Sequence, residues 1–109
     1  MWFCLTNGFV SVVEDRDDAS LLLIRARRKK DLVNVLGGNA EIFEDSEAEY
    51  RWRSFIGREA FKAIVSRRID AIDYPNFKDS VVEDELHDLY MEFWRLHRSY
   101  QKSDPQPPL

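Results

Sequence analysis

The sequence predicts an α+β domain: an antiparallel sheet of about five strands, in the order βββ-α-ββ-α-α, with helices packed on one face. Two observations predict this fold class. Aromatic and β-branched runs separated by turn residues fill the first 27 positions, as is usual for strands. After position 57, apolar residues instead recur every three or four places, which is the period of a helix. Strand runs followed by clustered helices are typical of α+β proteins.

The expected elements follow one another with mostly short connections. They are strands over 2–6, 9–13 and 21–27, a short helix over 29–36, a weak strand over 41–43, a strand over 50–56, and helices over 58–72 and 80–101.

A β-hairpin opens the chain. Its two strands are separated by Asn7-Gly8, and both of these residues accept the positive φ of a type I′ turn. Such a turn places Leu5 opposite Val10 and Phe3 opposite Val12. These four side chains are therefore expected to share one apolar face of the sheet.

Glycine and proline mark the ends of the predicted helices. Gly37-Gly38 stops the first helix, and Gly57 can cap the second. Tyr74-Pro75 ends the second helix, because the residue before a proline avoids the α region. Asp79 is expected to cap the last helix. The apolar stripe of that helix is Val82, Leu86, Leu89, Phe93, Leu96 and Tyr100.

Length and composition limit the class of protein. With 109 residues, 44% of them hydrophobic and 33% charged, the chain is expected to form a single domain over 1–102, followed by a flexible proline-rich tail over 103–109. The single Cys4 excludes an internal disulfide, favours a reducing compartment and is expected to be buried in its strand. We find no apolar run of membrane-spanning length and no signal peptide, so we expect a cytoplasmic protein without a membrane partner.

The formal net charge of -4 conceals blocks of opposite sign. Sixteen Lys and Arg stand against twenty Asp and Glu. Acidic runs at 14–18, 41–49 and 70–92 alternate with basic runs at 25–31 and 51–68. Such blocks usually lie on solvated faces of different elements, and either kind can also recognise a partner of the opposite charge.

The acidic blocks suggest a surface that engages a basic region of another protein, as nucleic-acid mimics do. The residues expected to take part are Glu41, Glu44, Asp45, Glu47, Glu49, Glu83, Asp84 and Asp88.

The basic blocks suggest the opposite partner. Arginines alternate with aromatic residues on two predicted strands, and cations beside rings are suited to single-stranded nucleic acid. The residues expected to form this surface are Arg25, Arg27, Arg28, Arg51, Trp52 and Arg53.

The chain offers few groups for catalysis. Its two histidines, His87 and His97, are separated by about 15 Å along one helix, which is too far to share a metal ion. An enzyme that uses His87 with Glu83 is therefore a third and weaker hypothesis, and we expect no catalytic residue, metal or cofactor. The histidines also belong to a second helical stripe, which can pack on the domain, on a partner or between the chains of a homodimer. It consists of His87, Tyr90, Trp94 and His97.

Short motifs run through the first hundred residues. They are Met1-Trp2-Phe3, GFVSVV at 8–13, IRAR at 24–27, Asp31-Leu32, Tyr50-Arg51, Ile72-Asp73-Tyr74 with Asn76-Phe77-Lys78, and Tyr90 with Trp94. Together they resemble an uncharacterised family of small bacterial proteins, found also on mobile elements. The resemblance covers the whole expected domain and brings no catalytic residues. Gly57 and Pro75 depart from its pattern.

These observations lead to one preferred function and two alternatives. The preferred function is a non-enzymatic module that binds another protein, for example an inhibitor of a bacterial defence system such as an anti-CRISPR protein. The alternatives are a nucleic-acid-binding domain that uses the basic surface and an enzyme centred on His87.

Overall fold

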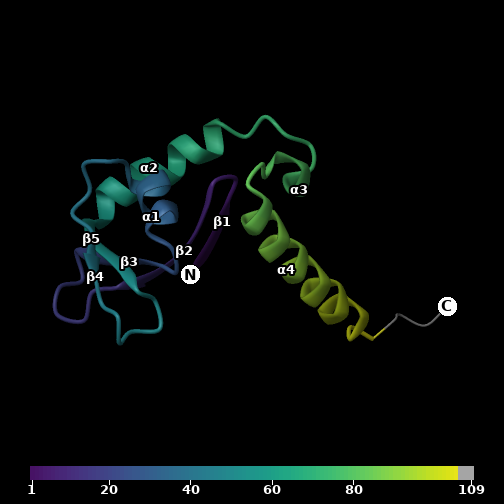
Figure 1. The fold of residues 1–109 in the computed structure, drawn as a ribbon, viewed down its shortest axis with the longest axis horizontal. Helices are drawn as coiled ribbons and strands as arrows, with labels where there is room; N and C mark the ends of the chain where they lie inside the picture. Colours follow the sequence, from purple (N-terminus) through teal and green to yellow (C-terminus); the bar gives the residue numbers. More distant parts are fainter. Residues whose placement is uncertain (106–109) are drawn as a thin grey trace.

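A five-stranded antiparallel sheet forms the centre of the molecule, with the strand order β1-β2-β3-β5-β4 (Figure 1). The computed structural model describes residues 1–105, and it confirms the α+β fold class. The strands are β1 (Trp2–Leu5), β2 (Gly8–Glu14), β3 (Leu21–Ala26), β4 (Phe43–Glu44) and β5 (Trp52–Gly57). The helices are α1 (Lys29–Leu36), α2 (Arg58–Asp70), α3 (Phe77–Ser80) and α4 (Asp84–Lys102).

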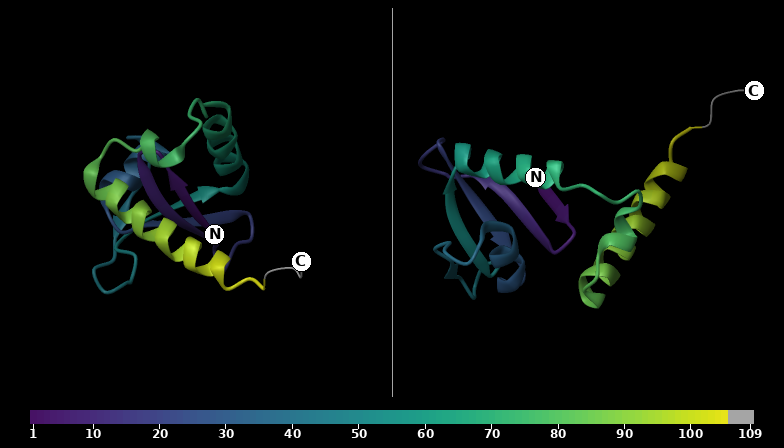
Figure 2. Two further views of the ribbon diagram at one scale, coloured as in Figure 1. Left: turned by 90° about the vertical axis from the view of Figure 1, so that its right-hand side faces the viewer. Right: turned by 90° about the horizontal axis from the view of Figure 1, so that it is seen from above.

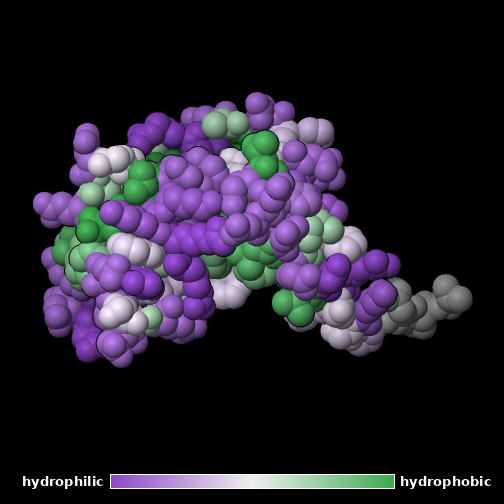
Figure 3. Space-filling view, in the orientation of Figure 1, coloured by the Kyte–Doolittle hydropathy of each residue, from purple (hydrophilic) through white to green (hydrophobic). Residues whose placement is uncertain are grey.

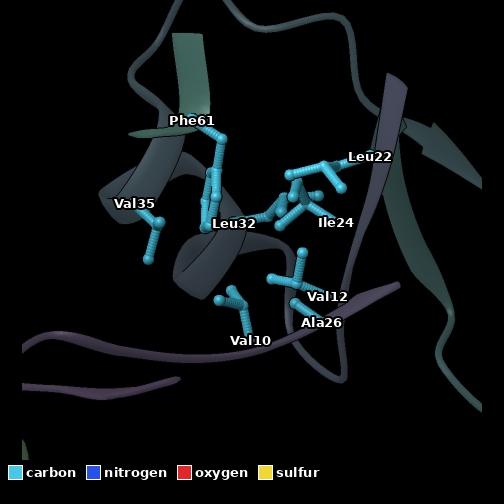
Figure 4. Packing of buried hydrophobic residues seen from close by; sticks show 8 residues of the cluster. All are labelled: Val10, Val12, Leu22, Ile24, Ala26, Leu32, Val35 and Phe61. Carbon is cyan, nitrogen blue, oxygen red and sulfur yellow. The ribbon is translucent and has the colours of Figure 1, made fainter. Parts of the chain in front are cut away.

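Helices α1 and α2 pack on one side of the sheet, which we call the core face. Leu32 of α1 and Ile24 of β3 are fully buried there, and Phe61 of α2 closes the cluster (Figure 4). Burying a side chain of this size contributes about 1.5–3 kcal/mol. The strands supply Val10, Val12, Leu22, Ile24 and Ala26 to this core.

The register of the opening hairpin differs from the expected one. Leu5 pairs with Gly8, and Phe3 pairs with Val10, so the pairing is shifted by two residues. The predicted type I′ turn is wrong, because Gly37 is the only residue among 1–105 with positive φ. Side chains alternate with a period of two, so a shift of two residues preserves the face on which each side chain lies. The prediction that Phe3 and Leu5 share a face with Val10 is therefore confirmed.

Gly8 is needed for the approach of α1 rather than for a turn. A Cβ atom at Gly8 would lie 3.0 Å from the carbonyl oxygen of Asp31 and 3.2 Å from Cγ2 of Val35. Contacts this short require the helix or the hairpin to move. Gly8 thus allows α1 to lie directly against β2.

Helix α4 does not join the other helices on the core face. It packs against the opposite side, which we call the back face, at the end formed by β1 and β2. Phe93 lies 5.6 Å from the ring centroid of Trp2 and 5.4 Å from that of Phe9. The expectation of helices on a single face therefore holds for α1 and α2 only. Phe9 accounts for this position of α4. Its side chain makes the back face of β2 apolar as well as the core face, so α4 can pack on the back face.

Tyr90 fastens α4 to the hairpin. Its hydroxyl lies 2.8 Å from the carbonyl oxygen of Leu5 and 2.9 Å from that of Gly8, and these two acceptors share its single proton. Burial strongly raises the pKa of Tyr90, so the hydroxyl keeps its proton and stays a donor at neutral pH.

The region between α2 and α4 differs in detail from the prediction. Helix α3 was not expected, and its N-cap is Asn76, whose side chain accepts from the amide of Asp79. Asp79 was expected to cap the last helix, but Glu83 does so by accepting from the amide of Leu86 at 3.0 Å. The second helix begins after Gly57, as predicted.

The C-terminal half of α4 leaves the body of the molecule, as Figures 1 and 2 show. The radius of gyration is 16.1 Å, whereas a compact chain of this length would have about 13 Å. Residues 94–105 are all exposed. The expected tail over 103–109 lies partly in this exposed segment, and 106–109 lie outside the described residues.

Gly8→Ala is expected to destabilise the fold by about 1–3 kcal/mol, because the added Cβ meets backbone and side-chain atoms of α1. Gly38→Ala is the matched control, since a Cβ there meets nothing within 4 Å, and its effect should stay below about 1 kcal/mol. Urea denaturation measures the free energy of unfolding of both variants. Equal stability of the two variants would contradict the role of Gly8.

Tyr90→Phe removes only the hydroxyl that binds the hairpin. We expect a loss of about 1–3 kcal/mol in the free energy of unfolding, and faster amide hydrogen exchange in α4 than in the sheet. Tyr100→Phe, at a position that is 81% exposed, should change stability by less than about 0.5 kcal/mol. Uniform exchange rates in α4 and the sheet would show that Tyr90 does not hold the helix.

Candidate binding surface

A single row of side chains crosses the whole sheet on its back face. The register places Trp2 opposite Ser11, Ser11 opposite Arg25, Arg25 opposite Arg53, and Arg53 opposite Phe43. Neighbouring strands lie about 4.8 Å apart, so the five side chains stand in line. We call them the arginine row. Aromatic rings form its two ends and a pair of arginines lies at its centre.

Arg25 and Arg53 carry charges that the chain does not neutralise. Neither takes part in the ion pairs formed among residues 1–105. The Nε atoms of both are shielded from solvent and have no hydrogen-bond acceptor. Like charges placed directly opposite each other weaken a sheet, and an unpaired buried donor costs up to about 3 kcal/mol. The pair of arginines therefore destabilises the sheet.

Arg25 is held in a defined position despite this lack of an ion pair. Its Nη2 donates to Oγ of Ser11 at 2.7 Å, and its guanidinium lies 4.6 Å from the ring centroid of Tyr50. The guanidinium of Arg27 lies 4.4 Å from the same ring. Tyr50 itself is buried. Cation–π contact with a buried ring fixes the direction of a guanidinium group, so Arg25 is pre-organised.

An apolar surface adjoins the arginine row on the side away from α4. Phe55 is 48% exposed and Phe43 is 41% exposed, and their rings stack with centroids 5.6 Å apart. Leu23 lies opposite Phe55 in the register. We call this surface the back-face patch. It consists of Val13, Leu21, Leu23, Phe43 and Phe55.

A groove of about 560 Å³ lies beside the contact between the back face and α4. Figure 3 shows the surface hollowed between the body and α4, with hydrophobic residues gathered along the hollow. Aromatic rings of the sheet, of the loop before β5 and of α4 line it, and carboxylates outnumber arginines among its charged residues. Those rings are Trp2, Phe9, Tyr50 and Phe93, and the charged residues are Arg27, Arg28, Asp31, Glu83, Glu85, Asp88 and Glu92.

Asp31 is the one carboxylate in this groove that is buried, with 6% of its surface exposed. Its Oδ2 accepts from the amide of Phe9 at 3.3 Å. Burial raises the pKa of Asp31, and the Phe9 amide and the charges of Lys30 and Arg28 only partly oppose that effect. The contact makes Asp31 a structural link between α1 and the hairpin.

The expected acidic residues do not form one unpaired surface. Glu44 pairs with Arg51, and Glu49 pairs with Arg27. Glu83 pairs with Lys30 at 3.0 Å, and this contact lowers the pKa of Glu83. The other five, Glu41, Asp45, Glu47, Asp84 and Asp88, are not in ion pairs within the described part of the chain, and they lie on two separate segments.

The expected basic residues divide into two groups. Arg27, Arg28 and Arg51 form ion pairs with carboxylates, whereas Arg25 and Arg53 do not. Trp52 is separate from both groups, because it packs half-buried against the core-face cluster. The basic surface suggested by the sequence therefore reduces to Arg25 and Arg53.

The second stripe of α4 is not a continuous surface. Tyr90 is buried in its own chain, whereas Trp94 is 41% exposed and has the ammonium group of Lys78 4.5 Å from its ring. His97 is exposed, and His87 is half-buried. His87 lines none of the five principal pockets of the described residues, so the geometry gives the enzyme hypothesis no cavity.

Sequence reasoning missed Ser11, Tyr50, Phe43 and Phe55 as parts of this surface. The alternation within each strand assigns them to a face, but only the pairing of strands aligns them with the arginines. The expected burial of Cys4 is also wrong, since Cys4 is exposed on the edge strand β1.

Within residues 1–105, no group of three or more His, Cys, Asp or Glu side chains is placed to hold a metal ion. None of the helices in this range is long and apolar enough to cross a lipid bilayer.

No protein-family model, curated protein or solved structure matches the chain.

Asp31→Asn tests the electrostatic environment of the groove. Because the pKa of Asp31 is raised on folding, the native protein binds the proton more tightly than the unfolded chain. The stability due to this proton is present below the unfolded pKa of about 4 and is lost as the pH rises through the native pKa. We compare the free energy of unfolding of the native protein with that of Asp31→Asn. The native value minus the variant value should fall as the pH rises from about 3 and then become constant. Urea denaturation at several pH values measures it, and a difference that increases with pH would contradict the raised pKa.

Proposed function

We propose that this chain is a non-enzymatic cytoplasmic module that binds another protein through its back face. The observation that supports this best is the exposed pair of stacked rings, Phe43 and Phe55, beside the unpaired Arg25 and Arg53. Aromatic residues and arginine are the types most enriched at the centres of protein interfaces. An exposed apolar patch next to polar groups is a frequent sign of such a site.

The same observation favours the basic and apolar side of the molecule over its acidic side. Three of the eight expected acidic residues already have cationic partners in the chain, so binding a basic partner would first break those pairs. Arg25 and Arg53 have no such contacts to lose. The partner is therefore expected to present acidic and apolar groups.

Single-stranded nucleic acid is the second candidate. Arg25, Arg53 and the two exposed rings support it, since bases can stack on phenylalanine while cations hold phosphates. Against it, only two arginines of this surface are unpaired, and the net charge is -4. Proteins that hold nucleic acid mainly through its backbone commonly make 6–10 phosphate contacts. The geometry therefore supports a discrete acidic partner better than a long polyanion.

An inhibitor of a bacterial defence system, such as an anti-CRISPR protein, is one form of this proposal. It requires the same property, a surface that recognises another protein without catalysis.

Phe55→Ser is expected to weaken partner binding strongly while the fold survives, because Phe55 is half-exposed and contributes little to the core. The tagged native chain captures its partner from a lysate of the host, and isothermal titration with the purified partner gives the affinity. Removing a central aromatic side chain should weaken binding about 30-fold or more.

Tyr100→Ser is the matched control, because Tyr100 is an exposed aromatic residue on α4, away from the patch. It should bind the partner like the native chain. Loss of binding in Tyr100→Ser but not in Phe55→Ser would move the interface to α4. Tight binding of a thymidine oligonucleotide, with a slope of log K against log salt of about -1.4 for two phosphate contacts, would favour the second candidate.

A further inference from the structure

The pair Arg25 and Arg53 has the properties of an anion site. The two arginines occupy paired positions on the neighbouring strands β3 and β5, and none of the carboxylates in 1–105 forms an ion pair with either. We propose that this pair binds a phosphoryl dianion carried by the partner protein. The partner is that of the proposed function, and the site is the centre of the same back face.

Charge selects the ligand class. The two guanidinium groups together carry +2, and a phosphoryl monoester carries about -1.5 to -2 at pH 7 on three oxygens. A single carboxylate would leave one positive charge without a partner. Two carboxylates on one partner would supply the charge, but their oxygens are not held in one tetrahedral group.

Hydrogen-bond geometry supports the same class. Each guanidinium offers a planar set of donors that matches phosphate oxygens in pairs. The Nε donors of Arg25 and Arg53 lack acceptors within the chain, and a change in the side-chain torsions of Arg53 would direct its donors to an oxyanion bound on the back face beside Arg25. Ser11 and Tyr50 already hold Arg25, so one half of the site is pre-organised.

Two carboxylates near the site are already paired with other arginines. The nearest cations along the chain, Arg27 and Arg51, are occupied by Glu49 and Glu44. Phe43 and Phe55 lie next to Arg53 on the same face and supply no charge. Apolar neighbours lower the local dielectric and so strengthen the interaction with a bound anion.

The test is a titration of the ¹⁵N-labelled full chain with inorganic phosphate at constant ionic strength, followed by NMR of the arginine Nε–H groups. We expect saturable shifts at Arg25 and Arg53 that share one dissociation constant, with no saturation at the exposed Arg16 and Arg67. Acetate should bind at least 10-fold more weakly. Similar shifts at all arginines, or equal affinity for acetate, would overturn the proposal.

Variants at one strand separate the site from general charge effects. Arg53→Gln should weaken phosphate binding at least 10-fold. Arg53→Lys keeps the positive charge but loses the planar set of guanidinium donors, so its affinity for phosphate should be intermediate. Arg51→Gln is the matched control, because Arg51 lies two residues from Arg53 and is already paired with Glu44. The affinity of this variant for phosphate should stay within about twofold of that of the native chain. Equal losses in Arg51→Gln and Arg53→Gln would refute a specific site.

A second arm identifies the source of the phosphoryl group. A phosphoserine peptide should bind at least 10-fold more tightly than the same peptide with serine, or with glutamate, at that position. Tighter binding of a thymidine oligonucleotide than of the phosphopeptide would overturn the proposal in favour of nucleic acid. Phosphate binding is measured on the isolated native chain without the partner, so it is a separate measurement from partner capture by Phe55→Ser. The native chain can bind phosphate even if Phe55→Ser still captures the partner, and it can fail to bind phosphate even if Phe55→Ser loses the partner.

Discussion

The close contact between α1 and the opening hairpin is the constraint on which the rest of the structure depends. Gly8 lets the backbone of Asp31 approach β2, and the Asp31 carboxylate then accepts from the amide of Phe9. On the other side of the same hairpin, Tyr90 donates to the carbonyls of Leu5 and Gly8. The hairpin thus binds α1 with its core face and α4 with its back face. A larger residue at position 8 would disturb both layers through one contact.

The position of α4 decides which part of the back face is available. Its first turn is tied to the start of α1 by pairs of Glu83 with Lys30 and with Arg28. Farther along, Phe93 packs on Trp2 and Phe9, and beyond this point the helix leaves the sheet. Helix α4 therefore covers the Trp2 end of the arginine row, while Phe43 at the other end and the neighbouring Phe55 stay exposed. A protein with both faces fully covered would have no room there for a partner.

Local pattern predicted most of the elements, because each regular strand or helix repeats a side-chain period that can be read from neighbouring residues. Helix α3 was missed because a four-residue segment is too short to show a period. The hairpin register was wrong by two residues because Asn7-Gly8 is a strong turn signal, whereas the real role of Gly8 lies in a contact with a helix more than twenty residues later. The side of the sheet taken by α4 could not be predicted either, since β2 is apolar on both faces. Arg25 and Arg53 were identified as candidates, but their lack of partners depends on where distant carboxylates fall.

The unpaired arginines cannot be explained by a shortage of acid. The chain has more Asp and Glu than Lys and Arg, and the arginines that directly flank these two strands, Arg27 and Arg51, do form ion pairs with carboxylates. Arg25 and Arg53 differ from them in position, because their neighbours on the back face are a serine and apolar side chains. A surface of this kind combines two contributions that usually act together in recognition. The apolar part supplies affinity through buried area, and the charged pair restricts the partner to one that brings a matching anion. The protein-binding surface and the anion site are therefore two parts of one proposal about the same face, and each can be tested by changing a different residue.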